Sequence, residues 1–556
     1  MVKVTNPTVS RFVATPAELD ALSGGYDGAK RFDAQLEGWQ PGLLSADAEI
    51  LPAKHMLDAR SRDMGRNDAF IQGGATVHKD SIVGGMYMLN AKPKHKLLGE
   101  GFSEDWAEEF QEEVEGLFTL WAESPMNWVD ASRRHDLTSM IRLAVGVQAF
   151  GGEVLAVAEW IDRRDREFKT AIKMVDPDRL STPYDMVGDP QVRAGIRVGV
   201  HGEPVTAYIR KAHPHDYNMI HAYDGMFWKA VRFHKPWGRH QVIYLSEQQR
   251  VEQTRAVADM VTALKEIAIT KRFRDVTLQN AVVNAMYAAT IESELPTEVV
   301  YQQMGAGQGT GNPVNKYANS FLGAVAEYLK GGNRMQIDGV KVPHLFPGTK
   351  LNMRPAGTPG GVGQDFEVSL LRYIAASLNI SYEELSRDYS RTNYSSARAA
   401  LNQSWRFMQA RKKLVADKFA NIVYRLWLEE AIWSDRLSTL RARQASKFYT
   451  NGHLNLMFDA LANADWIGAS RGQIDELKET QAAVLRIKYG LSTHEDELSK
   501  LGKDWRQTFA QLEREKKEMR DRDIILEEDD NMMNAASGTP RDSDEEAGKD
   551  KDADEK

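Results

Sequence analysis

The feature that most constrains the fold is the stretch from Ala397 to Trp433, which contains neither Gly nor Pro. Both residues commonly end helices, so their absence allows one continuous helix. Apolar side chains recur along it at helical spacing: Leu401, Trp405, Met408, Val415, Phe419, Ile422, Leu426 and Trp433. Such a helix spans roughly 50 Å, which is long for a globular core. We therefore expect it to pack against other helices or against other subunits.

Two shorter helices and a polar loop precede this long helix. The first carries apolar residues four positions apart: Phe366, Leu370, Ile374 and Leu378. Ser381 and Glu384 form the reciprocal capping-box pattern and predict a second, short helix. Residues 386–396 are rich in Ser, Arg, Tyr and Asn and hold no aliphatic side chain, which predicts an exposed loop. We expect Ser395 or Ser396 to cap the long helix that follows.

The size and composition of the chain limit the classes of protein to which it can belong. At 556 residues it exceeds what a single hydrophobic core organises, so we expect three or more domains. Apolar residues make up 42% of the chain and aromatic residues 9%, as is typical of folded proteins. No run of about 18 apolar residues and no secretory-signal pattern is present, so we expect no association with a membrane. The chain has no cysteine, which excludes disulfides, thiolate catalysis and Cys-based zinc sites.

The net charge of −8 is concentrated at the C-terminus. From Asp521 onward the sequence has fourteen Asp and Glu against five Lys and Arg, a balance of −9, so the remainder carries +1. A strong, sequence-independent DNA binder normally carries a basic field, so the nearly neutral body argues against that class of protein. The same neutrality is compatible with a surface past which DNA slides without sticking.

The N-terminal two thirds of the chain divide into segments of different character. Residues 1–50 have few periodic apolar positions and are expected to form a flexible arm. Helical patterns followed by short runs rich in Val, Ile and Tyr predict an α+β region over 51–256. A second long helix is expected over 257–294, which again lacks Gly and Pro. Residues 295–364 hold Gly-rich turns and a hairpin signal at 337–340, and predict a small α/β unit.

Beyond the long helix, residues 436–514 predict further helices. A helix that ends before Gly490 is expected to bury Ile474, Leu477, Ala482 and Leu485. Ser492 is expected to cap a following helix that continues toward Trp505. Residues 515–556 are acidic and poor in apolar side chains, which predicts a disordered tail.

The sequence contains no recognisable catalytic constellation. The Gly-rich run 305–311 lacks the Lys and Ser/Thr of a phosphate-binding loop, and we interpret it as part of a docking surface. His213, His215 and His221 match no metal-ligand spacing and are interpreted as surface histidines. Acidic clusters lie on the outer face of an amphipathic helix or in the tail. We therefore predict no enzyme activity, no cofactor and no metal site.

The loop that precedes the long helix is the best candidate for a functional site. Its interleaved side chains are of the types that touch phosphates and stack on bases: Arg387, Tyr389, Arg391, Asn393, Tyr394 and Arg398. The alternative is an ordinary polar turn between two helices, and the loop's composition does not separate these two interpretations.

Several stretches of the sequence resemble the portal proteins of lambda-like tailed bacteriophages. The similarity runs colinearly from about residue 50 to 515 through RNDAFIQGGATVHKDSIVGG, NAMYAATIESEL, KVPHLFPGTKLN, FEVSLLRYIAASLNISYEELSRDYSRTNYSSARAALNQSW, WLEEAI and ADWIGASRGQIDELKE. The resemblance implies an α+β portal fold. Its parts would be the wing at 51–256, two stem helices at 257–294 and 365–386, the clip at 295–364, the tunnel loop at 387–396, a long helix at 397–435, and C-terminal wing or crown helices at 436–514.

This resemblance also implies a function. The chain would form a ring of about a dozen identical subunits at one capsid vertex. Double-stranded DNA would pass through the ring during packaging and ejection. Terminase would dock on the clip, head-tail joining proteins would bind later, and the major capsid and scaffold proteins would be further partners. The expected location is the virion, and the host cytoplasm during assembly.

The resemblance assigns roles to particular residues. The tunnel-loop side chains would make transient DNA contacts, with Asp388 offsetting Arg387, Arg391 and Arg398, because strong phosphate contacts would stall translocation. Arg391→Ala is therefore expected to leave ring assembly intact and to alter DNA packaging or retention. Docking of the motor or connector is expected at clip residues Gln302, Gln308, Asn312, Lys316, Asn333 and Arg334.

Two other classes of protein remain as alternatives. A phage nuclease or terminase component would need a carboxylate cluster or a phosphate loop in a folded region, and the sequence offers neither. A generic scaffold or adaptor would also lack catalytic groups. It would not explain two long helices that flank a compact middle segment.

Overall fold

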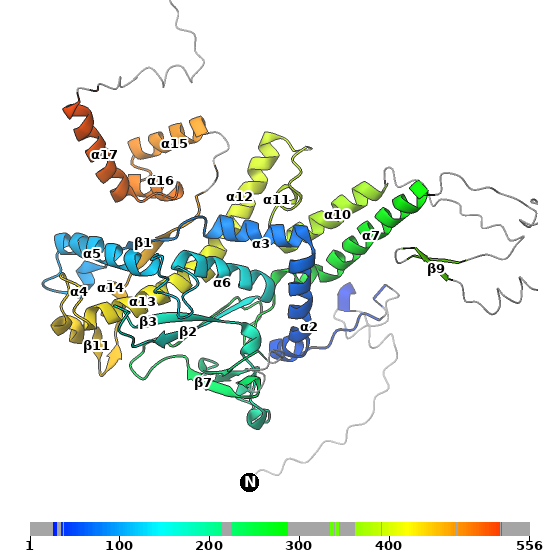
Figure 1. Ribbon diagram of the computed structural model, residues 1–556, viewed down its shortest axis with the longest axis horizontal. Coiled ribbons are helices and arrows are strands. Elements are labelled where there is room, and N and C mark those ends of the chain that lie inside the picture. The colour runs from blue at the N-terminus through cyan, green and yellow to red at the C-terminus, as the bar shows by residue number, and fades with distance from the viewer. Residues whose placement is uncertain are drawn as a thin grey trace, which may run out of the picture.

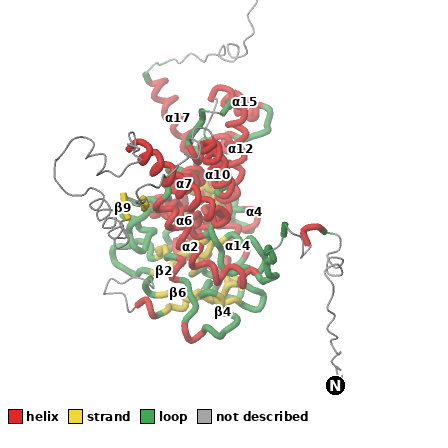
Figure 2. Tube along the Cα trace, turned by 90° about the vertical axis from the view of Figure 1, so that its right-hand side faces the viewer, coloured by secondary structure: helices red, strands yellow, loops and turns green. Residues whose placement is uncertain are grey.

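The strands of the molecule gather toward one end and most helices toward the other (Figure 2). The computed structural model describes residues 26–29, 35–36, 38–213, 224–286, 334–337, 340–343, 362–390, 392–470, 472, 476–522 and 524. Several predicted features therefore lie outside the described residues: the Gly-rich run 305–311, His215, His221, the docking residues Gln302, Gln308, Asn312, Lys316 and Asn333, and the tail from 525 onward.

The four longer helices of the N-terminal region begin at capping side chains. After the short η1 (Asp27–Ala29) they are α2 (Ala46–Asn67), α3 (Ala69–Ile82), α5 (Glu104–Ala122) and α6 (Leu137–Gly151), and the short α4 (His95–Leu98) lies between α3 and α5. Ser103 caps α5, and the left-handed Gly152 ends α6. Helix α2 begins inside the predicted arm 1–50, because Ser45 accepts a hydrogen bond from the N–H of Ala48.

Two antiparallel sheets face each other across a separate apolar core. The three-stranded sheet has the order β3–β2–β8, with β2 (Glu153–Trp160), β3 (Thr170–Val175) and β8 (Val242–Ser246). The four-stranded sheet runs in sequence order through β4 (Val192–Arg193), β5 (Ile196–Val198), β6 (Pro204–Arg210) and β7 (Trp228–Arg232). Short 3-10 turns connect them: η2 (Pro177–Arg179), η3 (Tyr184–Met186) and η4 (Asp224–Met226). The sequence did not predict β7.

The main core lies where α5, α6 and the long helix meet. The long helix comprises α12 (Tyr394–Arg411), a π-helical turn η6 (Lys412–Asp417) and α13 (Lys418–Trp433), so the predicted continuous helix carries one π turn. Trp427 on α13 is fully buried, with its ring centroid 5.3 Å from that of Phe118. A buried aromatic side chain removes about 150–250 Å² from water, worth roughly 4–6 kcal/mol. This aromatic cluster fixes α13 beneath α5.

The π turn is held by polar contacts at its two ends. Lys412 Nζ lies 2.8 Å from Asp417 Oδ1 and donates to the Trp466 carbonyl at 2.9 Å. Tyr87 donates its hydroxyl proton to the same Asp417 carboxylate. Just before the turn, the buried Arg411 pairs with Asp259 Oδ2 at 2.6 Å. The long helix is thereby tied to the segment that begins the second long helix.

A pair of helices projects from this body (Figure 1). The first follows η5 (Asp259–Ala263) as α7 (Leu264–Met286), and the second is α10 (Val362–Ser377). Arg274 Nε donates to Glu367 Oε1 at 2.6 Å, and the rings of Phe273 and Phe366 lie 5.7 Å apart, so the two helices pack side by side. The hairpin predicted at 337–340 is confirmed by the antiparallel strands β9 (Arg334–Ile337) and β10 (Val340–Pro343).

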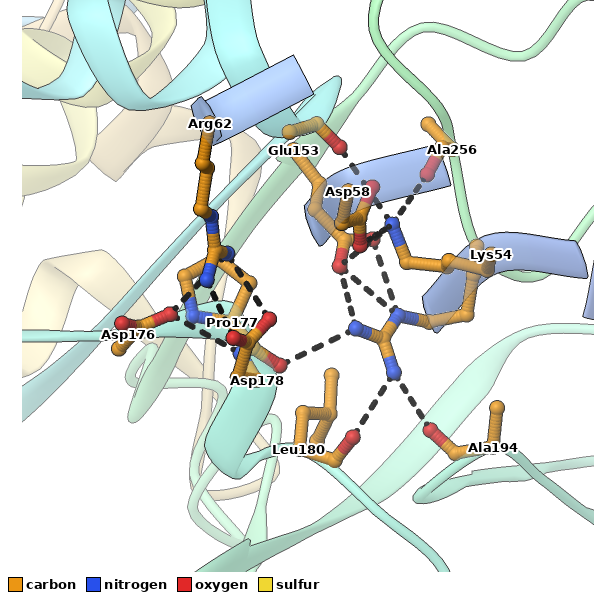
Figure 3. A network of polar contacts seen from close by, with 12 residues as sticks. Lys54, Asp58, Arg62, Glu153, Asp176, Pro177, Asp178, Leu180, Ala194 and Ala256 are labelled. Atoms are coloured by element: carbon orange, nitrogen blue, oxygen red, sulfur yellow. Dashed lines mark hydrogen bonds and ion pairs between the residues drawn. The ribbon is translucent and has the colours of Figure 1, made fainter. Parts of the chain in front are cut away.

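A buried polar network joins α2, β2 and the segment before α7 (Figure 3). Arg255 Nε donates to both oxygens of the fully buried Glu153, at 3.0 and 2.9 Å. The same guanidinium donates to the carbonyls of Pro177, Leu180 and Ala194 at 2.8–3.1 Å. Lys54 Nζ lies 3.3 Å from Glu153 and 3.0 Å from Asp58, and donates to the Ala256 carbonyl at 2.6 Å.

The C-terminal region contributes both strands and a separate helical group. After η7 (Ala442–Phe448) come the hairpin β11 (Tyr449–Thr450) and β12 (His453–Leu454), and α14 (Leu456–Leu461). Strand β13 (Ala464–Ile467) pairs antiparallel with β1 (Met88–Ala91), far away in sequence. The chain then forms α15 (Glu476–Lys488), α16 (His494–Lys500) and α17 (Trp505–Asp521).

Three predictions for the C-terminal helices were wrong. Helix α15 buries no residue, and Leu477 and Leu485 stay 59% and 46% exposed, because α15 lacks a partner on that face within the described part of one chain. Thr493, rather than Ser492, caps α16, and the left-handed Gly502 separates α16 from α17. Helix α17 continues through Asp521, beyond the predicted start of the tail at 515. Among the described helices none combines the length and the apolar character that crossing a membrane requires.

Candidate functional site

The predicted loop lies between α11 (Tyr382–Ser386) and α12, at the N-terminal end of the long helix (Figure 1). The chain reaches it from α10 through a short turn and α11, and Leu378 and Ile380 of the turn and Leu385 of α11 are buried against α3. Gly74 on α3 makes room for them, since a Cβ there would lie 2.9 Å from Leu378 Cδ1. The loop therefore stands on a packed apolar base.

A histidine on α3 also holds this base. His78 is buried, and its Nε2 lies 2.9 Å from the Leu378 carbonyl oxygen, to which the neutral ring donates a proton. Burial lowers the pKa of His78 to about 4, so the ring is neutral near pH 7. No local pattern in the sequence predicts this contact, because His78 and Leu378 are far apart in the chain.

The capping box predicted at Ser381 and Glu384 is confirmed, and it has a second role. Ser381 Oγ accepts from the Glu384 N–H at 3.1 Å, while Glu384 Oε2 accepts from the Ser381 N–H at 2.8 Å. The same Oε2 accepts the hydroxyl proton of Ser404 at 2.7 Å. Because Ser404 lies on α12, one carboxylate fastens the two helices on either side of the loop.

The loop itself is built from local polar contacts. Arg387 adopts the left-handed conformation, with φ of 57°, and ends α11. Asp388 Oδ1 accepts from the Ser390 N–H at 3.0 Å, which makes an Asx turn. Thr392 Oγ1 donates to Glu383 Oε1 at 3.2 Å and returns the chain to α11. The turn is thus short and braced at both ends.

The structure places five of the seven predicted loop side chains. Arg387, Asp388 and Tyr389 are consecutive and exposed, and Arg398 is exposed on the first turns of α12. Asn393 caps α12: its Oδ1 accepts from the Ser396 N–H at 2.8 Å. The prediction of a cap at Ser395 or Ser396 was therefore wrong, because the helix starts earlier. Arg391 and the side chain of Tyr394 lie outside the described residues, and of the docking residue Arg334 only the backbone in β9 is described.

The structure also brings one of the histidines to an acidic pair. Asp176, Asp178 and His213 place one ligand atom each within 4.8 Å of one another. Arg62 already occupies this group: its Nη2 donates to Asp178 Oδ1 at 2.8 Å and to Asp176 Oδ1 at 3.4 Å. Burial raises the pKa of Asp178, but its bonds to Arg62 outweigh burial and lower it. The group is thus an ion-pair cluster around a guanidinium.

Comparisons with known proteins agree with this architecture. A family model described as phage portal protein, lambda family, matches residues 32–412. The portal proteins of Escherichia phages N15 and lambda are each 36% identical over 506 residues, which cover 90% of this chain and 91% of theirs. This chain belongs to the lambda family of phage portal proteins. The predicted portal function and the α+β portal fold are confirmed by this membership.

Solved structures of phage-like particles also match. The neck of a native gene transfer agent particle, computed with C12 symmetry, matches with a TM-score of 0.34 at 10% identity, over 81% of this chain and 98% of that chain. The neck of an empty particle, computed with C6 symmetry, gives 0.33 at 12% identity, over 80% and 92%.

Proposed function

We propose that copies of this portal chain form a closed ring whose bore is lined by the loop 387–393 and conducts double-stranded DNA. The observation that carries the proposal is the braced, exposed polar loop at the end of a long helix, in a chain of the lambda portal family. A loop held on both sides by Glu384 keeps its position while DNA moves past it. The role is structural, and the proposal needs no catalytic group.

Exposed apolar surface supports an assembly of several copies. Helices α15 and α17 bury no side chain in the single chain. Leu477 is 59% exposed, and Phe509 and Leu512 on α17 also lie at the surface. We infer that these exposed apolar side chains contact other copies of the chain. In a closed ring each copy covers such faces on its neighbours, so that none is left open.

The charges of the loop favour low-affinity binding of DNA. Arg387 and Arg398 can each meet a phosphate, and Tyr389 offers an exposed ring. Asp388 reduces the local positive charge. Because each neutralised phosphate adds to a salt-dependent affinity, a ring with few cations per subunit holds DNA loosely enough to translocate it.

The remaining partners follow from family membership and the shape of the chain. The helix pair α7 and α10 projects from the body, and strand β9 lies near its far end in Figure 1. We assign this projecting end to terminase and later to head-tail joining proteins. The body around the two sheets is assigned to contacts with the major capsid and scaffold proteins. The finished ring resides in the virion and is assembled in the host cytoplasm.

The loop's role is tested by Arg387→Gly. Glycine removes the cation and tolerates the left-handed backbone at this position, so the turn is preserved. We expect normal ring yield, altered DNA packaging or retention, and a salt dependence of DNA binding lower by about one phosphate charge per subunit. Arg443→Ala, which removes an exposed arginine on η7, is the matched control. Normal rings with unchanged packaging and unchanged salt dependence would refute a DNA-facing loop.

A further inference from the structure

A small basic cleft opens at one end of the core between the two sheets. Its volume is about 140 Å³. Its floor consists of four buried apolar side chains, one from each of four strands: Val157, Val175, Ile209 and Val231. Its rim consists of the charged side chains Glu159, Lys173, Arg179, Lys211 and Lys229, and the backbone of Arg210 completes the lining. Four of these five side chains are cationic, in a chain whose body is otherwise nearly neutral.

The alternation of strands explains how the rim arises. Side chains two positions apart point to the same face of a strand, so each floor residue has a charged neighbour on the same face. The four pairs are Val157 with Glu159, Val175 with Lys173, Ile209 with Lys211, and Val231 with Lys229. The pairing register sets Val157 opposite Lys173 and Ile209 opposite Lys229. The charged residues therefore gather where the apolar core ends.

The arginine of the rim is bound by neutral oxygens. Arg179 Nε and Nη2 donate to the Arg210 carbonyl at 2.9 and 2.7 Å, and Nη2 donates to the Lys211 carbonyl at 2.6 Å. The Arg210 guanidinium lies on the opposite face of β6, where it donates to Ser181 Oγ at 2.8 Å and lies 4.4 Å from the Trp228 ring centroid. The bonds of Arg179 fix its side chain and leave its charge uncompensated.

Little negative charge reaches the cleft from the described residues. Burial lowers the pKa of Arg179, although the carboxylate of Asp176 acts in the opposite direction. Asp176 also pairs with Arg62 at 3.4 Å. Glu159 lies 3.5 Å from Lys229 Nζ, and Lys173 forms no ion pair with any described residue. The charge around the cleft is therefore mainly positive, which favours an oxyanion as its occupant.

We propose that this cleft binds carboxylate side chains of the acidic C-terminal segment 525–556 of this chain. The segment carries twelve Asp and Glu against four Lys and Arg, which complements the cationic rim. It follows Ile524, and its thirty-two residues can span up to about 100 Å. A recess of about 140 Å³ between strands admits a carboxylate on a single extended chain, whereas a DNA duplex is too wide to enter it. Binding would tether the tail to the sheet end of the molecule.

Zero-length carbodiimide crosslinking of the full chain, read by mass spectrometry, tests this proposal directly. The reagent joins a lysine to a carboxylate only when the two are in contact. We expect crosslinks from Lys173, Lys211 or Lys229 to acids in 525–556. They should be lost at about 1 M salt, where the Debye length falls to about 3 Å. Absence of tail crosslinks, or tail crosslinks spread evenly over all exposed lysines, would overturn the proposal.

Charge-reversal variants sharpen the test. Lys173→Glu with Lys211→Glu should reduce tail crosslinks at Lys229 by about tenfold or more, because two attractive charges become repulsive. The matched control, Lys94→Glu with Lys96→Glu, makes the same charge change at α4 and should leave them unchanged. Unfolding curves of all variants establish that the fold is intact. Equal loss in both variants would contradict a site at the cleft.

Competition identifies the chemistry of the occupant. A synthetic peptide of residues 525–556, added in excess, should suppress the crosslinks between the cleft lysines and the tail. Duplex DNA at equal charge concentration should suppress them less. Stronger suppression by DNA would overturn the assignment to the tail in favour of a phosphate site. Neither result depends on ring formation, so the proposal can fail while the portal function stands.

Discussion

Arg255→Ala tests the buried network that joins the two sheets to the segment before α7. The substitution removes the guanidinium that binds Glu153 and three backbone carbonyls. Removing one partner of a buried ion pair costs about 3–5 kcal/mol, and each carbonyl left without a donor adds about 1 kcal/mol or more. Lys54 remains 3.3 Å from Glu153 and offsets part of this loss. We therefore expect the free energy of unfolding to fall by about 4 kcal/mol or more.

The assay is urea denaturation followed by circular dichroism, with Arg250→Ala as the matched control. Arg250 pairs with Glu49 at the surface, where both side chains are more than 40% exposed, so its loss should cost about 1 kcal/mol or less. A double-mutant cycle with Glu153→Gln should give a coupling energy of about 2 kcal/mol or more. If Arg255→Ala costs no more than Arg250→Ala, the network does not hold the sheets together.

The stability lost on Arg255→Ala should depend on pH because Glu153 is ionisable. Burial raises the pKa of Glu153, but its contacts with Arg255 outweigh burial and lower it below the ordinary value of 4.5. A carboxyl whose pKa is lower in the folded state stabilises the protein above its unfolded pKa, and this contribution is lost as the pH falls. The difference between wild type and Arg255→Ala should accordingly narrow below about pH 4.5. A difference that widens in acid would refute this account.

Two further predictions concern a glycine and a carboxyl. Gly152→Ala should destabilise the chain by more than Gly202→Ala. Both glycines have positive φ, so either substitution strains the backbone by about 1–3 kcal/mol. Only at Gly152 would the added Cβ also lie 2.2 Å from the Val257 carbonyl oxygen. Equal unfolding midpoints for the two variants would contradict this. Burial raises the pKa of Glu115 to about 7, so the folded chain binds its proton more tightly, and stability should fall as the pH rises from about 4.5 to 7. Glu115→Gln should remove that part of the pH dependence, and an unchanged profile would refute the assignment.

A local pattern in the sequence predicted the start of α11 correctly. The capping box at Ser381 and Glu384 satisfies backbone groups within a few residues, so it can be predicted without knowledge of the fold. The cap of α12 was misplaced because Asn393 competes with the serines that follow it. The hairpin β9–β10 was predicted from its turn signal for the same local reason.

Contacts between distant segments could not be read from the sequence. The pairing of β1 with β13 and the contact of His78 with Leu378 join residues hundreds of positions apart. The π turn makes hydrogen bonds with Tyr87 and with the Trp466 carbonyl, which are distant in sequence, so helical periodicity does not predict it. Apolar residues recur along α15 at the spacing that is typical of a buried helix face, yet that face is exposed. The sequence does not show whether its partner belongs to the same chain or to another copy.

The hydrogen bonds that hold the loop were predicted only where they are local in sequence. The bond between Ser381 and Glu384 was predicted, whereas the bond from Ser404 to the same carboxylate depends on how α11 and α12 pack. The basic cleft likewise requires two sheets to face each other, although each strand shows its alternation in the sequence. Family resemblance supplied the portal function, which the residues of the loop alone left open.

The central claim is that copies of this chain stand around an axis with their polar loops facing the bore. Electron cryomicroscopy of the purified full-length protein tests it most directly, because one reconstruction shows both the assembly and the position of the loop. The account predicts rings with an axial channel, in which residues 387–393 form the constriction and α15 and α17 contact neighbouring copies. Particles that remain monomeric under assembly conditions, or rings that carry residues 387–393 on the outer rim, would contradict it.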